Sequence, residues 1–306
     1  MKILILTNYP VSIPLVKALH GMKDVDLSVG ILSEWDLMLS YLSTDDHSLR
    51  DCFYKLSEEN WEQDLAEHLR DNSIDALWTI SFPFKIPDES LDYPKFGSMN
   101  FHLGQLPQYR GPEPIFWQIR NGETHGALSV HKMEAQFDTG HLWNDYTFEL
   151  NQNDCYGSYL QKLESCIENA GFDLYNELNQ KGTLSLTPQN NQDAHYYKRP
   201  KKSDLQVDWN DNANSICNLI RACNPHLGGA LSYCGNTAIQ IFSANAGESN
   251  SEFPTGTIER IDHRGIAVNC RDNNCIWIRV INCHEGIFPA EIWAQNKGIN
   301  VGDRMG

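Results

Sequence analysis

The sequence lacks several patterns that would assign a function at once. No Gly-x-Gly-x-x-Gly or Walker sequence follows the first apolar run, so a nucleotide bound in the usual Rossmann manner has no support. The nine cysteines include no Cys-x-x-Cys pair, which favours free thiols over disulfides or zinc. No apolar run approaches the ~20 residues of a membrane span, and the first residues are more typical of a buried strand than of a signal peptide. We therefore expect a cytoplasmic protein.

Positive charge is also scarce in this chain. Lys and Arg number 24 against 40 Asp and Glu, which gives a formal net charge of −16. This charge disfavours long-range attraction of a polyanion such as tRNA, although a few local cations suffice for one diphosphate. The length of 306 residues predicts about two domains.

Apolar runs alternate with helical patterns through the first part of the chain. Strands are expected at 3–6, 28–32, 76–80, 98–101 and 128–133, and helices at 15–22, 61–72, 114–121 and 156–180. This alternation predicts an α/β catalytic domain over 1–186, with a Rossmann-like, mostly parallel sheet. A polar, proline-bearing linker is expected at 187–205. A helix at 212–223 and short strands with regular turn signals then predict a smaller β-barrel-like (OB-like) domain over 206–306.

Three polar residues of the first domain have the chemistry of acyl transfer to an amine. Asn100 and His102 alternate on one short strand, so their side chains share a face, and Asp138 lies just past the next strand. A neutral imidazole can take a proton from an ammonium, a carboxylate can orient it or balance its charge, and an amide N–H can bind an oxyanion. Burial decides whether His102 or Asp138 removes the proton, so both stay open.

The segment from Asn100 to Gly140 resembles the signature of the folate-dependent formyltransferase family, which includes methionyl-tRNA, glycinamide ribonucleotide and sugar-nucleotide formyltransferases. The family's Asn-x-His pair, Leu-Pro-x-Tyr/Trp-Arg-Gly loop and Asp-x-Gly turn are matched by Asn100 and His102, by 106–111 and by 138–140. The resemblance implies a formyl transfer from N10-formyltetrahydrofolate, a co-substrate, with Asn100, His102 and Asp138 as the catalytic trio. Segments 195–199, 207–209, 219–222 and 228–233 resemble the UDP-amino-sugar formyltransferases of lipid A modification.

The same resemblance implies which residues bind the two substrates. Those expected at the folate are Phe82, Phe84, Ile86, Leu106, Pro107 and Asp138. Those expected at the acceptor are Gln105, Tyr109, Arg110, Gly111, Lys198, Arg199 and Arg221. Lys198, Arg199 and Arg221 would hold a diphosphate, because cationic side chains clamp phosphate oxygens. The alternatives are a solvated basic linker for these cations and core packing for the two phenylalanines.

Two departures from the family pattern concern the acceptor. Gly104-Gln105 stands where the family usually has Ser-Leu, which alters the loop facing the amine. Where the tRNA enzymes carry a basic insertion, this chain has Ser33-Glu34-Trp35-Asp36 and Thr44-Asp45-Asp46-His47, which would repel phosphates. The expected acceptor is therefore a small primary amine, foremost an amino sugar on a nucleotide.

Other functions stay open from the sequence. Within enzymes, the alternatives are another small amine, such as a hydroxyornithine-like siderophore or peptide precursor, and in third place methionyl-tRNA. From other classes come a folate-binding or formate-releasing hydrolase relative and a non-catalytic interaction protein. His125, His131 and His141 lack metal-ligand spacing, so no metal is expected. No nucleic-acid or membrane partner is expected, and a homodimer is one option for the oligomeric state.

Overall fold

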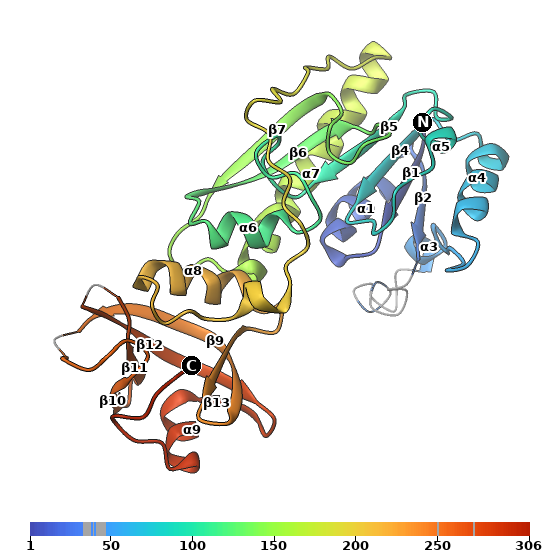
Figure 1. The fold of residues 1–306 in the computed structure, drawn as a ribbon. Coiled ribbons are helices and arrows are strands. Elements are labelled where there is room, and N and C mark those ends of the chain that lie inside the picture. The colour runs from blue at the N-terminus through green and yellow to red at the C-terminus, as the bar shows by residue number, and fades with distance from the viewer. Residues whose placement is uncertain (33–37, 39, 41–46, 250, 272) are drawn as a thin grey trace. The chain divides into compact units, whose positions relative to one another are not determined.

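The computed structural model describes residues 1–32, 38, 40, 47–249, 251–271 and 273–306. It divides into two compact units (Figure 1). The first consists of Met1–Pro114, His125–Phe148 and Leu160–Tyr197, and the second of Ile115–Thr124, Glu149–Tyr159 and Lys198–Gly306. The domain boundaries at 186 and 205 stay a prediction; by contacts, Leu160–Tyr197 belongs to the first unit, and two earlier segments belong to the second. The predicted acidic segments 33–36 and 44–46 lie outside the described residues, as does the side chain of His47.

A mostly parallel sheet forms the centre of the first unit (Figure 1). Within the described residues it has seven strands in the order β3-β2-β1-β4-β5-β6-β7. Their bounds are β1 (Lys2–Thr7), β2 (Asp26–Ile31), β3 (Phe53–Lys55), β4 (Ala76–Ile80), β5 (Ser98–His102), β6 (His125–Lys132) and β7 (Leu142–Glu149). Strands β1 to β5 pair in parallel and β6 runs antiparallel to β5. The predicted fold class is confirmed, and the structure adds β3 and β7.

Helix α4 (Trp61–Asn72) packs on this sheet through an apolar stripe. The helices up to residue 181 are η1 (Pro10–Ser12), α1 (Ile13–His20), α3 (His47–Arg50), α4 (Trp61–Asn72), α5 (Asp88–Leu91), α6 (Pro114–Arg120) and α7 (Tyr156–Lys181). In α4, Trp61, Leu65 and Leu69 recur at helical spacing and pack with Leu4 and Leu6 of β1. This packing holds the central strands rigidly, and with them the polar residues near their carboxyl ends. Among the described residues, no helix has the length and apolar composition needed to cross a membrane.

An antiparallel sheet forms the second unit, in the order β10-β11-β12-β9-β8 with β13 paired to β12. Its elements are η2 (Lys202–Leu205), α8 (Ala213–Cys223), β8 (Ala230–Cys234), β9 (Thr237–Glu248), β10 (Ile258–Asp262), β11 (Gly265–Asn269), β12 (Asn274–Cys283), β13 (Gly286–Pro289) and α9 (Ala290–Lys297). Residues 303–306 bond to both edge strands: Tyr233 N–H donates to the Gly306 carbonyl over 2.8 Å, and Ile258 N–H donates to the Asp303 carbonyl over 2.8 Å. These bonds close the sheet in the barrel-like manner predicted.

Candidate active site

A row of three polar side chains crosses the sheet from β4 to β6. Thr79 is the register partner of Asn100 across the β4–β5 pair, and Asn100 is the partner of His131 across the β5–β6 pair. Thr79 Oγ1 donates to Asn100 Oδ1 over 2.8 Å, and Asn100 Nδ2 donates to His131 Nε2 over 3.1 Å. His131 Nδ1 faces the Lys132 carbonyl, so in the neutral ring Nε2 is an acceptor and the amide nitrogen of Asn100 must face it. One of the two amide N–H groups of Asn100 is used by His131, and the other has no hydrogen-bond partner among the residues that the structure describes.

The protonation of both site histidines follows from their partners. His102 Nε2 lies 2.7 Å from the Tyr109 carbonyl oxygen, so Nε2 carries a proton and donates it. His131 Nδ1 likewise donates to the Lys132 carbonyl over 2.8 Å, which leaves Nε2 to accept from Asn100. In the neutral state, the unprotonated nitrogen of His102 is therefore Nδ1.

Asp138 lies between these two imidazoles. Its Oδ1 is 3.5 Å from His102 Nδ1 and 3.6 Å from His131 Nε2, and its Oδ2 accepts the Gly111 N–H over 2.9 Å. With His102 neutral, Oδ1 faces the lone pair of Nδ1, which is electrostatically unfavourable, whereas the lone pair of His131 Nε2 is taken by the Asn100 N–H. One added proton on His102 Nδ1 turns this arrangement into an ion pair. The structure thus brings Asn100, His102 and Asp138 together, with the unprotonated nitrogen of His102 facing the carboxylate.

For both His102 and Asp138, burial and the neighbouring polar groups shift the pKa in opposite directions. Burial lowers the pKa of His102 below its ordinary 6.5, although Asp138 and the Tyr109 carbonyl act to raise it. Burial alone would raise the pKa of Asp138, but His102, His131 and the Gly111 N–H outweigh it and bring that pKa to about 2. At neutral pH the site therefore holds an ionised carboxylate beside a neutral imidazole. His102 thus has an unprotonated Nδ1 that can accept a proton.

The loop of residues 106–111 is held against these groups. Leu106 N–H donates to Ser129 Oγ over 3.0 Å, and the Tyr109 ring stacks on Tyr197 with centroids 5.2 Å apart. Leu106, Pro107, Tyr109 and Gly111 are buried, whereas Gln105 is partly exposed. Arg110, predicted at the acceptor, is also buried, and its guanidinium donates to Gln189 Oε1 and Asn191 Oδ1.

Three of the residues predicted at the folate, Phe82, Phe84 and Ile86, lie in different surroundings. Ile86 is fully enclosed in the core cluster of β1, β4 and α4, and Phe82 is partly buried against the same cluster. Phe84 is 48 % exposed, and its ring stacks on Trp61 with centroids 5.6 Å apart. Core packing thus accounts for Ile86 and part of Phe82. Phe84 keeps a face that a folate could contact.

The predicted diphosphate cations are used unequally. Arg221 donates to the carbonyl oxygens of Asn151 and Asp154 and to Asn218 Oδ1, which ties the 151–154 turn to α8. Its guanidinium therefore serves the fold of the second unit. Lys198 and Arg199 have exposed side chains.

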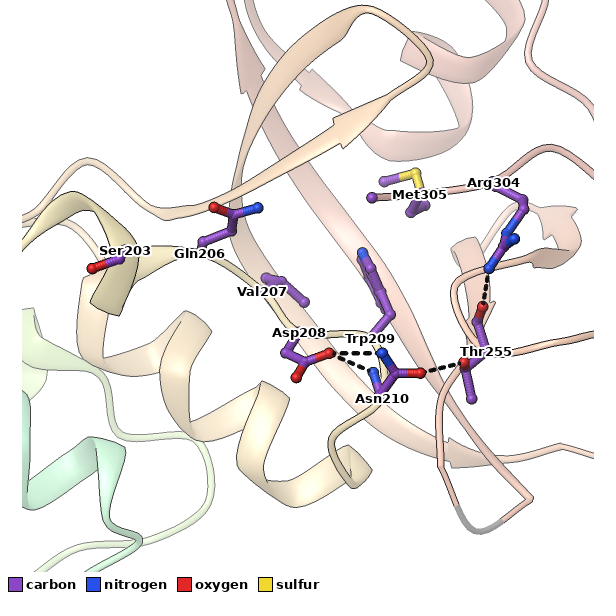
Figure 2. A pocket seen from close by; sticks show the side chains of 10 residues that line it. Ser203, Gln206, Val207, Asp208, Trp209, Asn210, Thr255, Arg304 and Met305 are labelled. Carbon is purple, nitrogen blue, oxygen red and sulfur yellow. Dashed lines mark hydrogen bonds between the residues drawn. The ribbon is translucent and has the colours of Figure 1, made fainter.

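A depression of about 440 Å³ in the second unit lies beside Trp209, Asp208 and Arg304. Figure 2 shows that its polar rim is bonded internally: Asp208 accepts from Asn210, Thr255 donates to Asn210, and Arg304 donates to the Thr255 carbonyl. None of the predicted site residues lines it. In the described part of the chain, no group of three or more His, Cys, Asp or Glu is arranged to hold a metal ion.

Comparison with known families decides the family of this chain. The model described as formyl transferase matches residues 45–170, and the model described as formyl transferase, C-terminal domain, matches residues 199–297. The chain belongs to the formyltransferase family. The resemblance seen in the sequence and the predicted enzyme class are confirmed. Asn100, His102 and Asp138 all fall within the first match, and their individual roles stay a prediction.

Individual relatives differ in their acceptors. Methionyl-tRNA formyltransferase of Burkholderia thailandensis is 28% identical over 231 residues, covering 76% of this chain and 70% of that protein. HypX from Aquifex aeolicus in complex with tetrahydrofolic acid is 18% identical with a TM-score of 0.67, over 98% of this chain and 48% of that one. The chain thus spans about half the length of HypX. WlaRD, a sugar 3N-formyl transferase with dTDP and 5-N-formyl-THF, is 18% identical with a TM-score of 0.64, over 90% of this chain and 96% of that one. These structural matches establish the fold.

Sequence reasoning missed three residues of this site. His131 was considered only as a metal ligand, although its position on the strand after His102 could have suggested a cross-strand neighbour of Asn100. Thr79 could have been found by the same argument on β4. Gln189 gave no signal, because it lies in the segment predicted to be a linker.

Proposed function

We propose that this enzyme transfers the formyl group of N10-formyltetrahydrofolate to a small-molecule primary amine. The observation that carries the proposal is the convergence of Asn100, His102 and Asp138, with one amide N–H and one ring nitrogen left for substrates. Family membership supports formyl transfer, and the folates bound to HypX and WlaRD support the donor.

The proposed mechanism assigns the proton acceptor to His102. Its Nε2 is committed to the Tyr109 carbonyl, so Nδ1 receives the proton that the acceptor ammonium loses, and ionised Asp138 balances the charge. The amine nitrogen then bonds to the formyl carbon, and the remaining N–H of Asn100 stabilises the oxyanion. The intermediate collapses as the bond from carbon to N10 breaks, and the second proton lost by the acceptor nitrogen passes to N10, which leaves as the amine of tetrahydrofolate. No covalent enzyme intermediate is required.

Charge supports a small acceptor. Residues 198–306 contain 11 Lys and Arg and 11 Asp and Glu, so the net −16 of the whole chain resides in residues 1–197. Phosphate neutralisation by many cations supplies most of the affinity of proteins for nucleic acids, and this chain offers few. Within small amines, we propose an amino sugar on a nucleotide. The dTDP in WlaRD supports this choice, and exposed Lys198 and Arg199 supply local cations.

Methionyl-tRNA is the second candidate acceptor, because the B. thailandensis relative carries that name. One assay tests both. The enzyme is incubated with N10-formyltetrahydrofolate and, separately, with dTDP- and UDP-linked amino sugars, the free amino sugars, N-hydroxyornithine and methionyl-tRNA. The product is scored by the mass of one added formyl group. We expect transfer to an amino sugar nucleotide.

Three other outcomes have definite meanings. Efficient formylation of methionyl-tRNA, with tight binding at low salt, would overturn the small-amine proposal. Transfer to N-hydroxyornithine alone would keep a small acceptor but remove the nucleotide. Formate released equally with and without any amine would indicate a hydrolase.

A further inference from the structure

The side chain of Gln189 joins Asp138 to Arg110. Gln189 Nε2 donates to the Asp138 carbonyl over 2.9 Å and to the Gly140 carbonyl over 2.7 Å. Its Oε1 accepts from Arg110 Nε over 3.1 Å and from Arg110 Nη2 over 2.7 Å. Carbonyls only accept and a guanidinium only donates, so this amide has one possible orientation. All four of its hydrogen-bonding positions are occupied.

The turn that Gln189 holds is conformationally costly. Asp138 has a φ of 59°, in the left-handed region that residues with a side chain seldom adopt. Such a conformation is energetically unfavourable and persists only when its surroundings fix it. Two bonds from one amide to the carbonyls on either side of Thr139 provide that fixation.

The backbone around Gln189 also holds the loop that faces Asp138. Within the first unit, His195 N–H donates to the Pro107 carbonyl, Arg110 N–H to the His195 carbonyl and Tyr197 N–H to the Arg110 carbonyl. A Cβ at Gly111 would lie 2.0 Å from the Tyr197 carbonyl oxygen. The 106–111 loop and the chain at Tyr197 can therefore approach this closely only because residue 111 is glycine. We call residues 189–197 the strap. The strap therefore contacts both the 106–111 loop and the Asp138 turn.

We infer that Gln189 is a positioning residue that acts through Asp138, by holding the carboxylate against His102 Nδ1 while Arg110 holds Gln189. Arg110 thereby has a role inside the enzyme rather than at the acceptor. Gln189 lies between the two segments that match the family models. The inference rests on the proposed function, because it assumes that Asp138 takes part in transfer.

A double-mutant cycle tests the inference. Steady-state formyl transfer is measured for the wild type, Gln189→Glu, Asp138→Asn and the double variant, each with its Tm. Gln189→Glu keeps an acceptor for Arg110 but cannot donate to the two carbonyls, and its equal size preserves folding. We expect kcat to fall about 10–100-fold, as for a small misplacement of a catalytic group, with the KM of both substrates little changed. In the Asp138→Asn background the same substitution should cost less than about twofold, because residues that act through one another are not additive.

Gln192→Ala is the matched control, since Gln192 is exposed in the same strap. It should retain wild-type kcat. Full activity of Gln189→Glu, or losses that multiply in the double variant, would overturn the positioning role while leaving the proposed function intact. An Asp138→Asn variant with wild-type activity would remove Asp138 from the mechanism, and the positioning role with it, whereas a wild-type enzyme that transfers no formyl group would overturn the proposed function.

Discussion

Asn100 and His131 face each other across the antiparallel pair of β5 and β6, and Asn100 Nδ2 donates to His131 Nε2 over 3.1 Å. With Thr79 on the other side, this bond fixes the amide so that its remaining N–H has one direction. A donor that is oriented before the substrate arrives needs no reorganisation during the reaction, which is the basis of oxyanion stabilisation.

Removal of this donor should slow transfer. Asn100→Ala is expected to lower kcat about 10²–10³-fold, as for the loss of one oxyanion donor. Steady-state kinetics with both substrates varied measure the effect. A change confined to the KM of the folate would make Asn100 a binding residue and remove its role in the mechanism.

His102→Ala and Asp138→Ala should each abolish most transfer in a folded protein. Loss of a general base typically costs about 10²–10⁴-fold, and the charge partner of that base contributes through it. Single-turnover rates and far-UV circular dichroism give activity and fold together. His125→Ala, at the exposed start of β6, is the control and should behave as the wild type. Wild-type turnover in either test variant would contradict the catalytic assignment.

The dependence of kcat on pH should reflect His102. Its pKa in the folded enzyme lies below 6.5 because burial disfavours the charged ring, so kcat should rise with pH below 6.5 and level off near pH 7. In Asp138→Asn the carboxylate that raises the pKa of His102 is absent, so the remaining activity should show its acidic limb at lower pH. Profiles at saturating substrates check this. An acidic limb that moves upward in the variant would contradict the assignment.

Stability should fall in acid for the same reason. The folded-state pKa of His102 is lower than its unfolded value, so its contribution is full above pH 6.5 and is lost as pH falls through the folded pKa. Asp138, with a pKa of about 2 against 3.8 in the unfolded chain, contributes above pH 3.8 and loses that contribution toward pH 2. Asp138→Asn should therefore flatten the decrease of Tm below pH 4. An unchanged slope would indicate that the carboxylate is not held as described.

Substitution of the three predicted diphosphate cations should distinguish acceptor binding by Lys198 and Arg199 from a structural role of Arg221. Replacement of the exposed Lys198 and Arg199 together by Ala should raise the KM of a phosphorylated acceptor several-fold and leave the KM of the folate unchanged. Arg221→Ala should instead lower Tm, because it removes three hydrogen bonds between the 151–154 turn and α8 or within α8. An unchanged acceptor KM in the Lys198/Arg199 variant would favour an acceptor without phosphate.

Local pattern was sufficient for much of this protein. Period-2 apolar runs and helical stripes predicted the mostly parallel sheet, because burial of one face imposes that spacing within a single element. The trio of Asn100, His102 and Asp138 was found because its members lie near the ends of strands and close together in sequence. Short strands with regular turns likewise indicated the second, barrel-like sheet.

Only the tertiary structure decided which further groups join that trio. His131 contacts Asn100 because β6 pairs with β5 in one particular register, and no single strand encodes the register of its neighbour. Gln189 lies 51 residues beyond Asp138 and is joined to it by side-chain hydrogen bonds that carry no periodic signal. The sequence by itself indicated most of the strands and helices and singled out the candidate residues, whereas packing decided the long-range bonds that orient those residues and that hold the side chains of Arg110 and Arg221.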